Sequence, residues 1–308
     1  MTVKPVDLEG KRLLITGATG FVAQPIIAAL AHSSEVFAAA RYQKSEQKTS
    51  MRALGATPVV VDLASSDFSQ LPDVDYVLNL AVAKSGKWRT DLAINAENLG
   101  HLMQRYQNVA AFLHVSSTAV YAYSDHQAKD EYAALGDNHK HLFETYSISK
   151  IAAESVARFA AKTFDIPLTI ARLNVPYGNF PCWPYFHLMM MQNGMPIDIH
   201  PDQPNGYSPI HADDYIAKIP YLLAAASCDT TLVNLAGDEV VSIEQWCEYM
   251  SELTGLPVSF NKTEQALGNL SVNTTRQTEL SGACHMPWQR GIKSMIETLA
   301  PDLLQTHA

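Results

Sequence analysis

Short apolar segments alternate with longer amphipathic segments through the first 175 residues of this chain. The apolar segments span residues 12–16, 35–40, 57–62, 75–81, 110–117 and 167–173, and helical patterns cover residues 21–32, 45–54, 91–107 and 145–163. Strands that are separated by helices join through right-handed crossovers into a parallel sheet covered on both faces. The alternation therefore predicts an α/β fold with a doubly wound parallel sheet.

The rhythm changes after residue 175. The stretches "PYGNFPCWPYF" (176–186) and "HPDQPNGYSPIH" (200–211) are rich in proline, glycine and aromatic residues, a composition typical of loops over a site. A further helix is expected at residues 213–226. We therefore expect one domain at residues 1–174 and a smaller region at residues 175–308, some segments of which return to the first domain.

Composition narrows the possible partners and the compartment. The chain has 308 residues, 47% of them hydrophobic, and a net charge of −9 with no run of basic residues, which excludes a typical nucleic-acid surface. The first 12 residues do not resemble a signal peptide, and no stretch approaches the roughly 18 apolar residues of a membrane span. We expect a cytoplasmic protein without membrane contact. Its cysteines should be reduced thiols, because none forms a C-x-x-C pair: Cys182, Cys228, Cys247 and Cys284.

A glycine-hinged turn, "GATG" at residues 17–20, follows the first predicted strand and opens a helix. Such a turn presents free backbone N–H groups and the positive end of a helix, where a pyrophosphate can bind. Ala23 takes a third small position, where close packing of the helix on the strand tolerates alanine. Taken alone, the motif also fits a tight strand–helix turn without a ligand.

Three later segments follow the turn in order: "FLHVSSTAVYA" (112–122), "YSISK" (146–150) and "RLNVPYG" (172–178). Their order and spacing resemble the extended short-chain dehydrogenase/reductase family, the NAD(P)-dependent epimerase/dehydratase group. Later segments also look like landmarks of that family, so the resemblance covers nearly the whole chain: residues 79–81, 208–215 and 234–246. The resemblance implies a Rossmann-type sheet, a nicotinamide cofactor, and a C-terminal region that binds a small-molecule substrate. It also implies a homodimer through helices 91–107 and 145–163.

The resemblance assigns a set of cofactor contacts along the chain. Asp62 and Leu63 match the pair that contacts adenine in the family. The other implied contacts are Gly17, Thr19, Gly20, Phe21, Val22, Leu80, Ala81, Tyr146, Lys150 and Val175. Asn95 matches a family asparagine, but Asn98-Leu99 stands where the family usually has glycine-threonine.

Tyr146 and Lys150 stand four residues apart on a predicted helix, so both project from one face. A phenol with a pKa of about 10 is a poor acid or base at neutral pH, but a neighbouring ammonium stabilises the phenolate. Tyr146 can then exchange a proton with a substrate oxygen. A lone Y-x-x-x-K is more often an ordinary amphipathic helix, whereas the accompanying motifs favour the catalytic interpretation.

Ser117 ends a predicted strand, at the sheet edge where doubly wound folds bind ligands. Its hydroxyl could hydrogen-bond the oxygen that Tyr146 protonates, and Ser117 rather than Ser116 matches the family's catalytic serine or threonine. A turn or N-cap serine is the structural alternative.

Cofactor choice depends on the end of the second strand. An acidic residue about twenty positions beyond the glycines would accept the ribose 2′-hydroxyl of NAD, but the chain has Ala39, Ala40 and Arg41 there. An arginine can instead pair with a 2′-phosphate. NADP(H) is therefore favoured over NAD(H), and an exposed arginine without a ligand is the alternative.

The expected substrate is small and carries no nucleotide diphosphate. Between Arg172 and Arg276 the only basic side chains besides histidine are Lys218 and Lys262, whereas a diphosphate in a cleft calls for arginine. Aromatic residues and methionines at residues 180–191 suit an apolar or aromatic carbonyl compound, unless they form core. The expected substrate contacts are Val82, Thr118, Trp183, Phe186 and Tyr207.

We thus expect NADP-dependent hydride transfer to or from a carbonyl or secondary alcohol. An epimerase or dehydratase could use the same residues transiently, and a cofactor-sensing protein without turnover is a third possibility. No metal site is expected, since the H-x-D spacing of His211, Asp213 and Asp214 lacks a third ligand nearby. His139, His141 and His187 are expected at the surface or a pocket rim.

Overall fold

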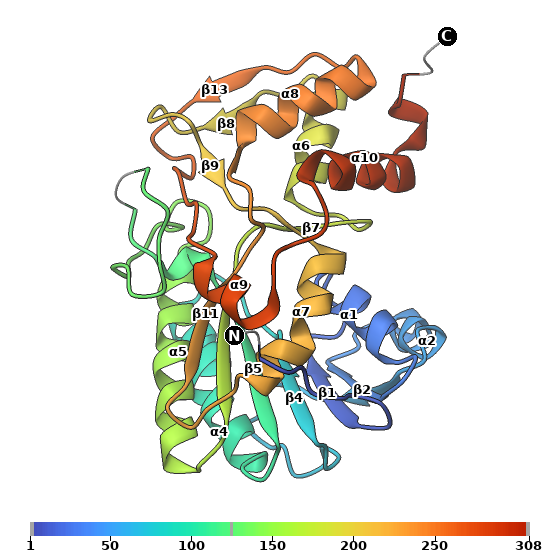
Figure 1. Ribbon diagram of the computed structural model, residues 1–308, viewed down its shortest axis with the longest axis vertical. Coiled ribbons are helices and arrows are strands. Elements are labelled where there is room, and N and C mark those ends of the chain that lie inside the picture. The colour runs from blue at the N-terminus through green and yellow to red at the C-terminus, as the bar shows by residue number, and fades with distance from the viewer. Residues whose placement is uncertain (1–2, 124–125, 306–308) are drawn as a thin grey trace.

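A seven-stranded parallel sheet forms the centre of the computed structural model, which describes residues 3–123 and 126–305 (Figure 1). The strands are β1 (Arg12–Thr16), β2 (Glu35–Ala40), β3 (Thr57–Val60), β4 (Tyr76–Asn79), β5 (Ala111–Ser117), β6 (Leu168–Leu173) and β11 (Thr231–Leu235). Their spatial order is β11-β6-β5-β4-β1-β2-β3, so the chain reverses direction across the sheet between β1 and β4. This confirms the predicted doubly wound sheet and places its switch point beside the glycine turn.

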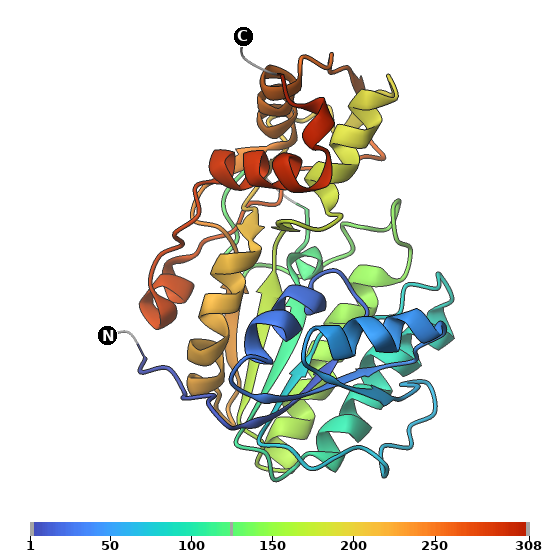
Figure 2. The same cartoon turned by 90° about the vertical axis from the view of Figure 1, so that its right-hand side faces the viewer.

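Helices cover both faces of the sheet (Figure 2). They include α1 (Ala23–Leu30), α2 (Ser45–Ala53), α4 (Asn98–Arg105), α5 (Tyr146–Thr163) and α7 (Ala212–Ala224). Side chains alternate along β1: Leu13 and Ile15 pack with α1 and α7, while Leu14 packs with α4 and α5 on the other face. Two apolar layers therefore hold the sheet.

The single helix expected at residues 91–107 is interrupted. α3 (Trp88–Leu92) begins three residues earlier, a π-helical turn follows at Ala93–Glu97, and α4 continues from there. π turns insert one residue into a helix and are frequent at functional sites. The turn carries Asn95, a buried residue that bonds to the loop after β4.

A smaller lobe lies over the carboxyl ends of the strands (Figure 1). It contains α6 (Trp183–Gln192), α8 (Ile243–Thr254), α10 (Trp288–Leu299) and short strands β7 (Pro176–Tyr177), β8 (Ile197–Ile199), β9 (Gly206–Tyr207), β10 (Ile210–His211), β12 (Val241–Ser242) and β13 (Phe260–Lys262). The expectation of a loop across residues 176–186 was wrong in part, since α6 begins at Trp183. Pro184 fits because a proline at the first turn removes an N–H that has no helical partner.

The core of this lobe contains a histidine that was expected at the surface or a pocket rim and methionines that were expected to suit a substrate. His187 is 5% exposed, and its Nδ1 accepts a hydrogen bond from the indole N–H of Trp246 at 2.9 Å. Burial lowers the pKa of His187 to about 4, so the ring is neutral. The expectation of a surface histidine was therefore wrong. Met191 is buried, and Met189 and Met190 pack against the same core, so these methionines are structural.

A buried ion pair joins the sheet to α5. The guanidinium of Arg172 on β6 donates to both carboxylate oxygens of Glu154 on α5, at 2.9 and 2.7 Å. The hydroxyl of Ser116 donates to the same carboxylate at 2.6 Å. Arg172 also lies 4.8 Å from the centroid of the Tyr121 ring. Because every polar group of the pair finds a partner, the charges are tolerated in the core.

Removing one member of this pair should destabilise the protein strongly. Glu154→Ala leaves the buried Arg172 without its counter-ion, and we expect the free energy of unfolding in urea to fall by about 3–5 kcal/mol. The control is Glu297→Ala, which breaks an exposed pair with Lys293 and should change it by less than about 0.5 kcal/mol. Equal effects of the two substitutions would contradict the structural importance of the pair.

Candidate active site

The turn between β1 and α1 requires glycine at its first position. Gly17 has φ of +69°, and a Cβ there would lie 2.9 Å from the backbone of Ala81, at the end of β4. A side chain would thus be strained and would also push β4 away. The absence of that side chain leaves a backbone cradle in front of the N-terminus of α1, which suits the pyrophosphate of a dinucleotide.

A cavity of about 240 Å³ opens beside this turn, and we call it the glycine-turn cavity. It brings together eight residues expected to contact a cofactor: Gly17, Thr19, Gly20, Arg41, Asp62, Leu63, Leu80 and Ala81. Val82, expected to contact substrate, also lines this cavity, because the chain turns here at the end of β4. Arg41 is exposed just beyond β2. The backbone turn at one end of this cavity has the chemistry that a dinucleotide's pyrophosphate requires.

A second cavity, of about 370 Å³, surrounds Tyr146 and is called the Tyr146 cavity. Four expected substrate residues line it, namely Thr118, Trp183, Phe186 and Tyr207, together with Ser117. Four residues expected to contact the cofactor lie here rather than in the glycine-turn cavity: Phe21, Val22, Tyr146 and Val175. The two linings adjoin along the chain at Gly20-Phe21 and at Ala83-Lys84. A ligand in one cavity would therefore lie next to a ligand in the other.

Ser117 and Tyr146 are brought together by the end of β5 and the start of α5. Burial raises the pKa of Tyr146, and a hydrogen bond with the Ser117 hydroxyl opposes that shift. Ser117 Oγ also accepts the N–H of Ala119 at 3.1 Å, so it caps a short 3₁₀ turn as well. Ser116 is buried and bonded to Glu154, which leaves Ser117 as the serine at the cavity wall.

Lys150 lies one turn beyond Tyr146 and is buried, lining neither cavity. Its Nζ donates to the carbonyl oxygen of Val115 on β5 at 2.9 Å. Burial and the charge of Lys84 lower the pKa of Lys150 to about 8, while Glu154 opposes this shift. The ammonium thus stays charged at neutral pH and supplies positive potential beneath the Tyr146 cavity.

Asn95 acts on the loop after β4. Its side chain accepts the N–H of Ala83 at 2.7 Å and donates to the Ala83 carbonyl and to Ser149 Oγ. Asn98, which stands where the family usually has glycine, donates to the carbonyl oxygen of Leu63 at 2.5 Å. Both asparagines therefore hold backbone segments that line the glycine-turn cavity.

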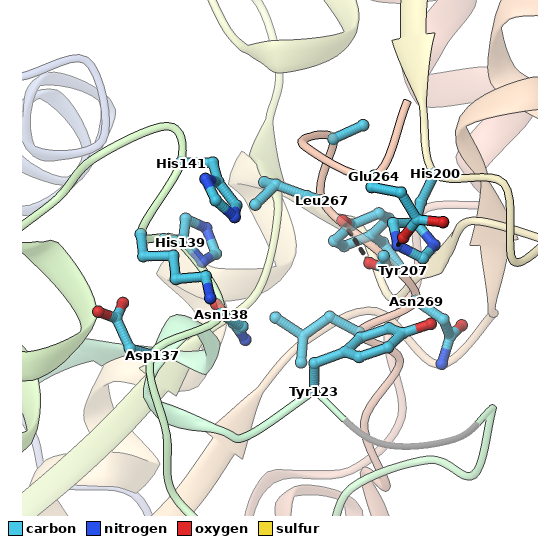
Figure 3. A pocket seen from close by; sticks show the side chains of 14 residues that line it. Tyr123, Asp137, Asn138, His139, His141, His200, Tyr207, Glu264, Leu267 and Asn269 are labelled. Atoms are coloured by element: carbon cyan, nitrogen blue, oxygen red, sulfur yellow. Dashed lines mark hydrogen bonds and ion pairs between the residues drawn. The ribbon is translucent and has the colours of Figure 1, made fainter. Parts of the chain in front are cut away.

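A third, polar cavity of about 230 Å³ shares His139, Tyr207, Leu267 and Leu270 with the Tyr146 cavity. Figure 3 shows His139 and His141 on one side of it, and His200 and Glu264 on the opposite side. Burial, together with the charge of Lys84, lowers the pKa of His139 to about 4. His139 is therefore neutral at physiological pH, and the shared lining makes this cavity a polar extension of the Tyr146 cavity.

None of the described residues that line the Tyr146 cavity or its polar extension is an arginine. Arg276 belongs to α9 (Thr275–Ser281), and its guanidinium donates to the hydroxyl of Tyr132 at 3.2 Å. Within residues 3–123 and 126–305, no group of three potential ligands could hold a metal ion. His211 caps α7 by accepting the N–H of Asp213, and Asp214 accepts backbone N–H groups of residues 285 and 286.

The comparison with known proteins begins with a family model. The model of the NAD dependent epimerase/dehydratase family matches residues 13–235, more than half of the chain. A trifunctional UDP-glucose 4,6-dehydratase/UDP-4-keto-6-deoxy-D-glucose 3,5-epimerase/UDP-4-keto-L-rhamnose-reductase of Arabidopsis thaliana is 27% identical over an alignment of 237 residues. The match covers 66% of this chain and 34% of that protein. The match thus spans about a third of the length of this curated relative.

Solved structures share the fold at low sequence identity. UDP-glucuronic acid 4-epimerase from Bacillus cereus in complex with NAD has a TM-score of 0.81 and 18% identity, covering 95% of this chain and 99% of that chain. UDP-glucose 4-epimerase from Thermotoga maritima with UDP-glucose has a TM-score of 0.78 and 17% identity, covering 95% and 99%. No helix in the described part of the chain has the length and apolar character needed to cross a membrane.

Proposed function

The chain belongs to the NAD dependent epimerase/dehydratase family, and on that premise we propose that it catalyses hydride transfer at a carbonyl or secondary-alcohol carbon. The observation that carries this proposal is the junction of two cavities. The glycine-turn cavity adjoins a cavity with Ser117 and Tyr146 in its wall. A substrate oxygen at Tyr146 would therefore lie beside a cofactor bound over the glycine turn.

In the proposed mechanism, a bound nicotinamide supplies or accepts the hydride. Tyr146 gives a proton to the substrate oxygen during reduction and takes it back during oxidation. Ser117 hydrogen-bonds the same oxygen. Lys150 stabilises the phenolate form of Tyr146 by its charge and orients the cofactor ribose, a role implied by the family.

Two forms of this chemistry remain as candidates. The family and the named relatives support a sugar epimerase or dehydratase, which oxidises and re-reduces its substrate. The lining of the Tyr146 cavity supports net oxidoreduction of a small apolar or aromatic compound, because the described lining has aromatic walls and no arginine. The comparisons thus favour an epimerase or dehydratase, and the cavity lining is the observation that favours net oxidoreduction.

A substrate screen tests the proposal. The protein is loaded with reduced or oxidised cofactor and offered aldehydes, ketones, alcohols and sugar nucleotides, while the absorbance of the reduced nicotinamide is followed. A net change in reduced nicotinamide with a carbonyl or alcohol supports oxidoreduction. Interconversion of sugar nucleotides without a net change in reduced nicotinamide supports an epimerase. Cofactor binding without turnover across the panel would favour the cofactor-sensing alternative.

We also propose a cytoplasmic homodimer. The contact would use α4 and α5, the helices that the family resemblance implies. Phe159 on α5 is 68% exposed, and this contact would bury its side chain.

Tyr146→Phe should abolish most of the activity while leaving cofactor binding intact. The substitution keeps the ring and removes only the hydroxyl, so we expect turnover to fall by about 10²–10⁴-fold. Tyr132→Phe serves as the control, since Tyr132 is 82% exposed and lies outside the cavity lining. Turnover is measured at saturating cofactor. Substantial activity in Tyr146→Phe would mean that the proton comes from another group.

Arg41 should make the protein prefer NADPH over NADH. Arg41→Ala removes a charge-assisted contact to the 2′-phosphate, and we expect the difference in binding free energy between the cofactors to narrow by about 1–3 kcal/mol. Calorimetric titration with NADPH and with NADH measures this difference in binding free energy. Arg89→Ala, on α3, is the control because Arg89 is exposed outside the glycine-turn cavity. Equal affinities for NADPH and NADH in the unmodified protein would disprove the preference.

Nucleotide diphosphates should bind weakly to the cofactor-loaded protein. A diphosphate needs arginine forks when it enters a desolvated cleft, and the described lining of the Tyr146 cavity and its polar extension provides none. Calorimetric titration of the NADP-loaded protein with UDP, GDP and a hydrophobic ketone makes the comparison. Micromolar binding of UDP or GDP would put the sugar-nucleotide epimerase first.

A further inference from the structure

The loop after β4, residues 80–87, is held by two buried side chains. Asn95, 6% exposed, bonds both the N–H and the carbonyl oxygen of Ala83. Asp91, fully buried, accepts the N–H and the hydroxyl of Ser85 and the N–H of Gly86, at distances of 2.7–3.1 Å. Lys84 lies between these two anchored positions, so its backbone is fixed on both sides.

The same two anchors reach the first turns of α5. Asp91 also accepts the hydroxyl of Thr145 at 2.5 Å, and Thr145 is the residue before Tyr146. Asn95 also donates to Ser149 Oγ, one residue before Lys150. The loop and the N-terminal end of α5 are therefore tied into one unit by buried hydrogen bonds.

This unit holds an ammonium group over the proposed acid–base. Lys84 Nζ lies 4.7 Å from the centroid of the Tyr146 ring and 4.7 Å from the centroid of the Phe143 ring. Both distances are within the range of a cation–π interaction. Ionisation of the phenol delocalises negative charge into the ring, so the attraction to Lys84 is greater for phenolate than for phenol.

We propose that Lys84 is a positioning residue that, together with Lys150, stabilises the phenolate of Tyr146 by lying over the face of its ring. The inference rests on the proposed role of Tyr146 and deepens it. Lys150 approaches from within the sheet, where its Nζ donates to Val115. Lys84 approaches from the cavity side, where it is itself a lining residue.

The other groups around Tyr146 determine how far the loss of Lys84 should shift the pKa of Tyr146. Burial raises the pKa of Tyr146, and Ser117 on β5 opposes that shift. His139 is neutral, and the pKa of the buried His114 on β5 is far below its usual value, so neither ring adds positive charge. Loss of Lys84 would also raise the pKa of Lys150, whose charge Glu154 supports. Water also partly screens the charge of Lys84. We therefore expect the loss of that charge to raise the pKa of Tyr146 by about one unit.

Ultraviolet titration of phenolate tests the inference without any substrate. Each variant is titrated with Tyr146 present and with Tyr146→Phe, and the difference isolates the ionisation of Tyr146. Lys84→Met should raise the midpoint by about one unit, or about tenfold in the ionisation constant. Lys84→Arg keeps the charge and should leave the midpoint near that of the unmodified protein. Lys87→Met is the matched control, because Lys87, like Lys84, is an exposed lysine of this loop, but it lines neither cavity.

An unchanged midpoint in Lys84→Met, or equal shifts in Lys84→Met and Lys84→Arg, would overturn the inference. In the active enzyme, the acid limb of kcat/KM for alcohol oxidation should move to higher pH in Lys84→Met by the same amount, because more alkaline conditions are needed to form phenolate. The titration is independent of turnover. Failure of the screen would therefore count against the proposed function and leave this result standing.

Discussion

The buried pair of Arg172 and Glu154 holds together the parts on which the candidate site depends. Glu154 lies on α5 one turn beyond Lys150, and Arg172 lies on β6 beside β5. The pair thus fixes α5 against the strand that ends in Ser117. Its partners extend the link: Tyr121 stacks on Arg172 and donates to Asn234 on β11. A charge pair of this kind is costly to bury, but its many partners leave only one arrangement in which every polar group is satisfied.

The arrangement separates binding from proton transfer. In the glycine-turn cavity, the turn presents backbone groups and the N-terminus of α1. The lining of the Tyr146 cavity is mainly aromatic and aliphatic. Its titratable side chains are few, and His139 is held neutral by burial. The proposed proton exchange would therefore be concentrated on Tyr146, which lies between Lys84 on the cavity side and Lys150 within the protein.

Local patterns in the sequence predicted six strands of the sheet, the main helices and the meeting of Ser117 with Tyr146. The seventh strand was missed because "TLVNL" at residues 231–235 is short and follows a long irregular region. His187 was misplaced because its environment comes from Trp246, 59 residues away. Lys84 carried no signal in the sequence, since its loop is held by Asn95, which lies in a π-helical turn that no periodicity reveals, and by Asp91 on the short helix before that turn. The hydrophobic pattern of the sequence thus located the helices and strands. The electrostatics of the site depend on long-range hydrogen bonds, which that pattern does not reveal.

The position of β11 has a consequence for how the chain is made. β6 pairs with β5 on one side and with β11 on the other, and β11 is more than fifty residues later in the chain. During synthesis, the glycine turn, Ser117 and Tyr146 all emerge from the ribosome while the outer edge of β6 is still unpaired. An open edge of this kind recruits other strands. The nascent chain is therefore exposed to aggregation in the interval between residues 173 and 231, when the part that carries Ser117 and Tyr146 has been made and the last strand of the sheet has not.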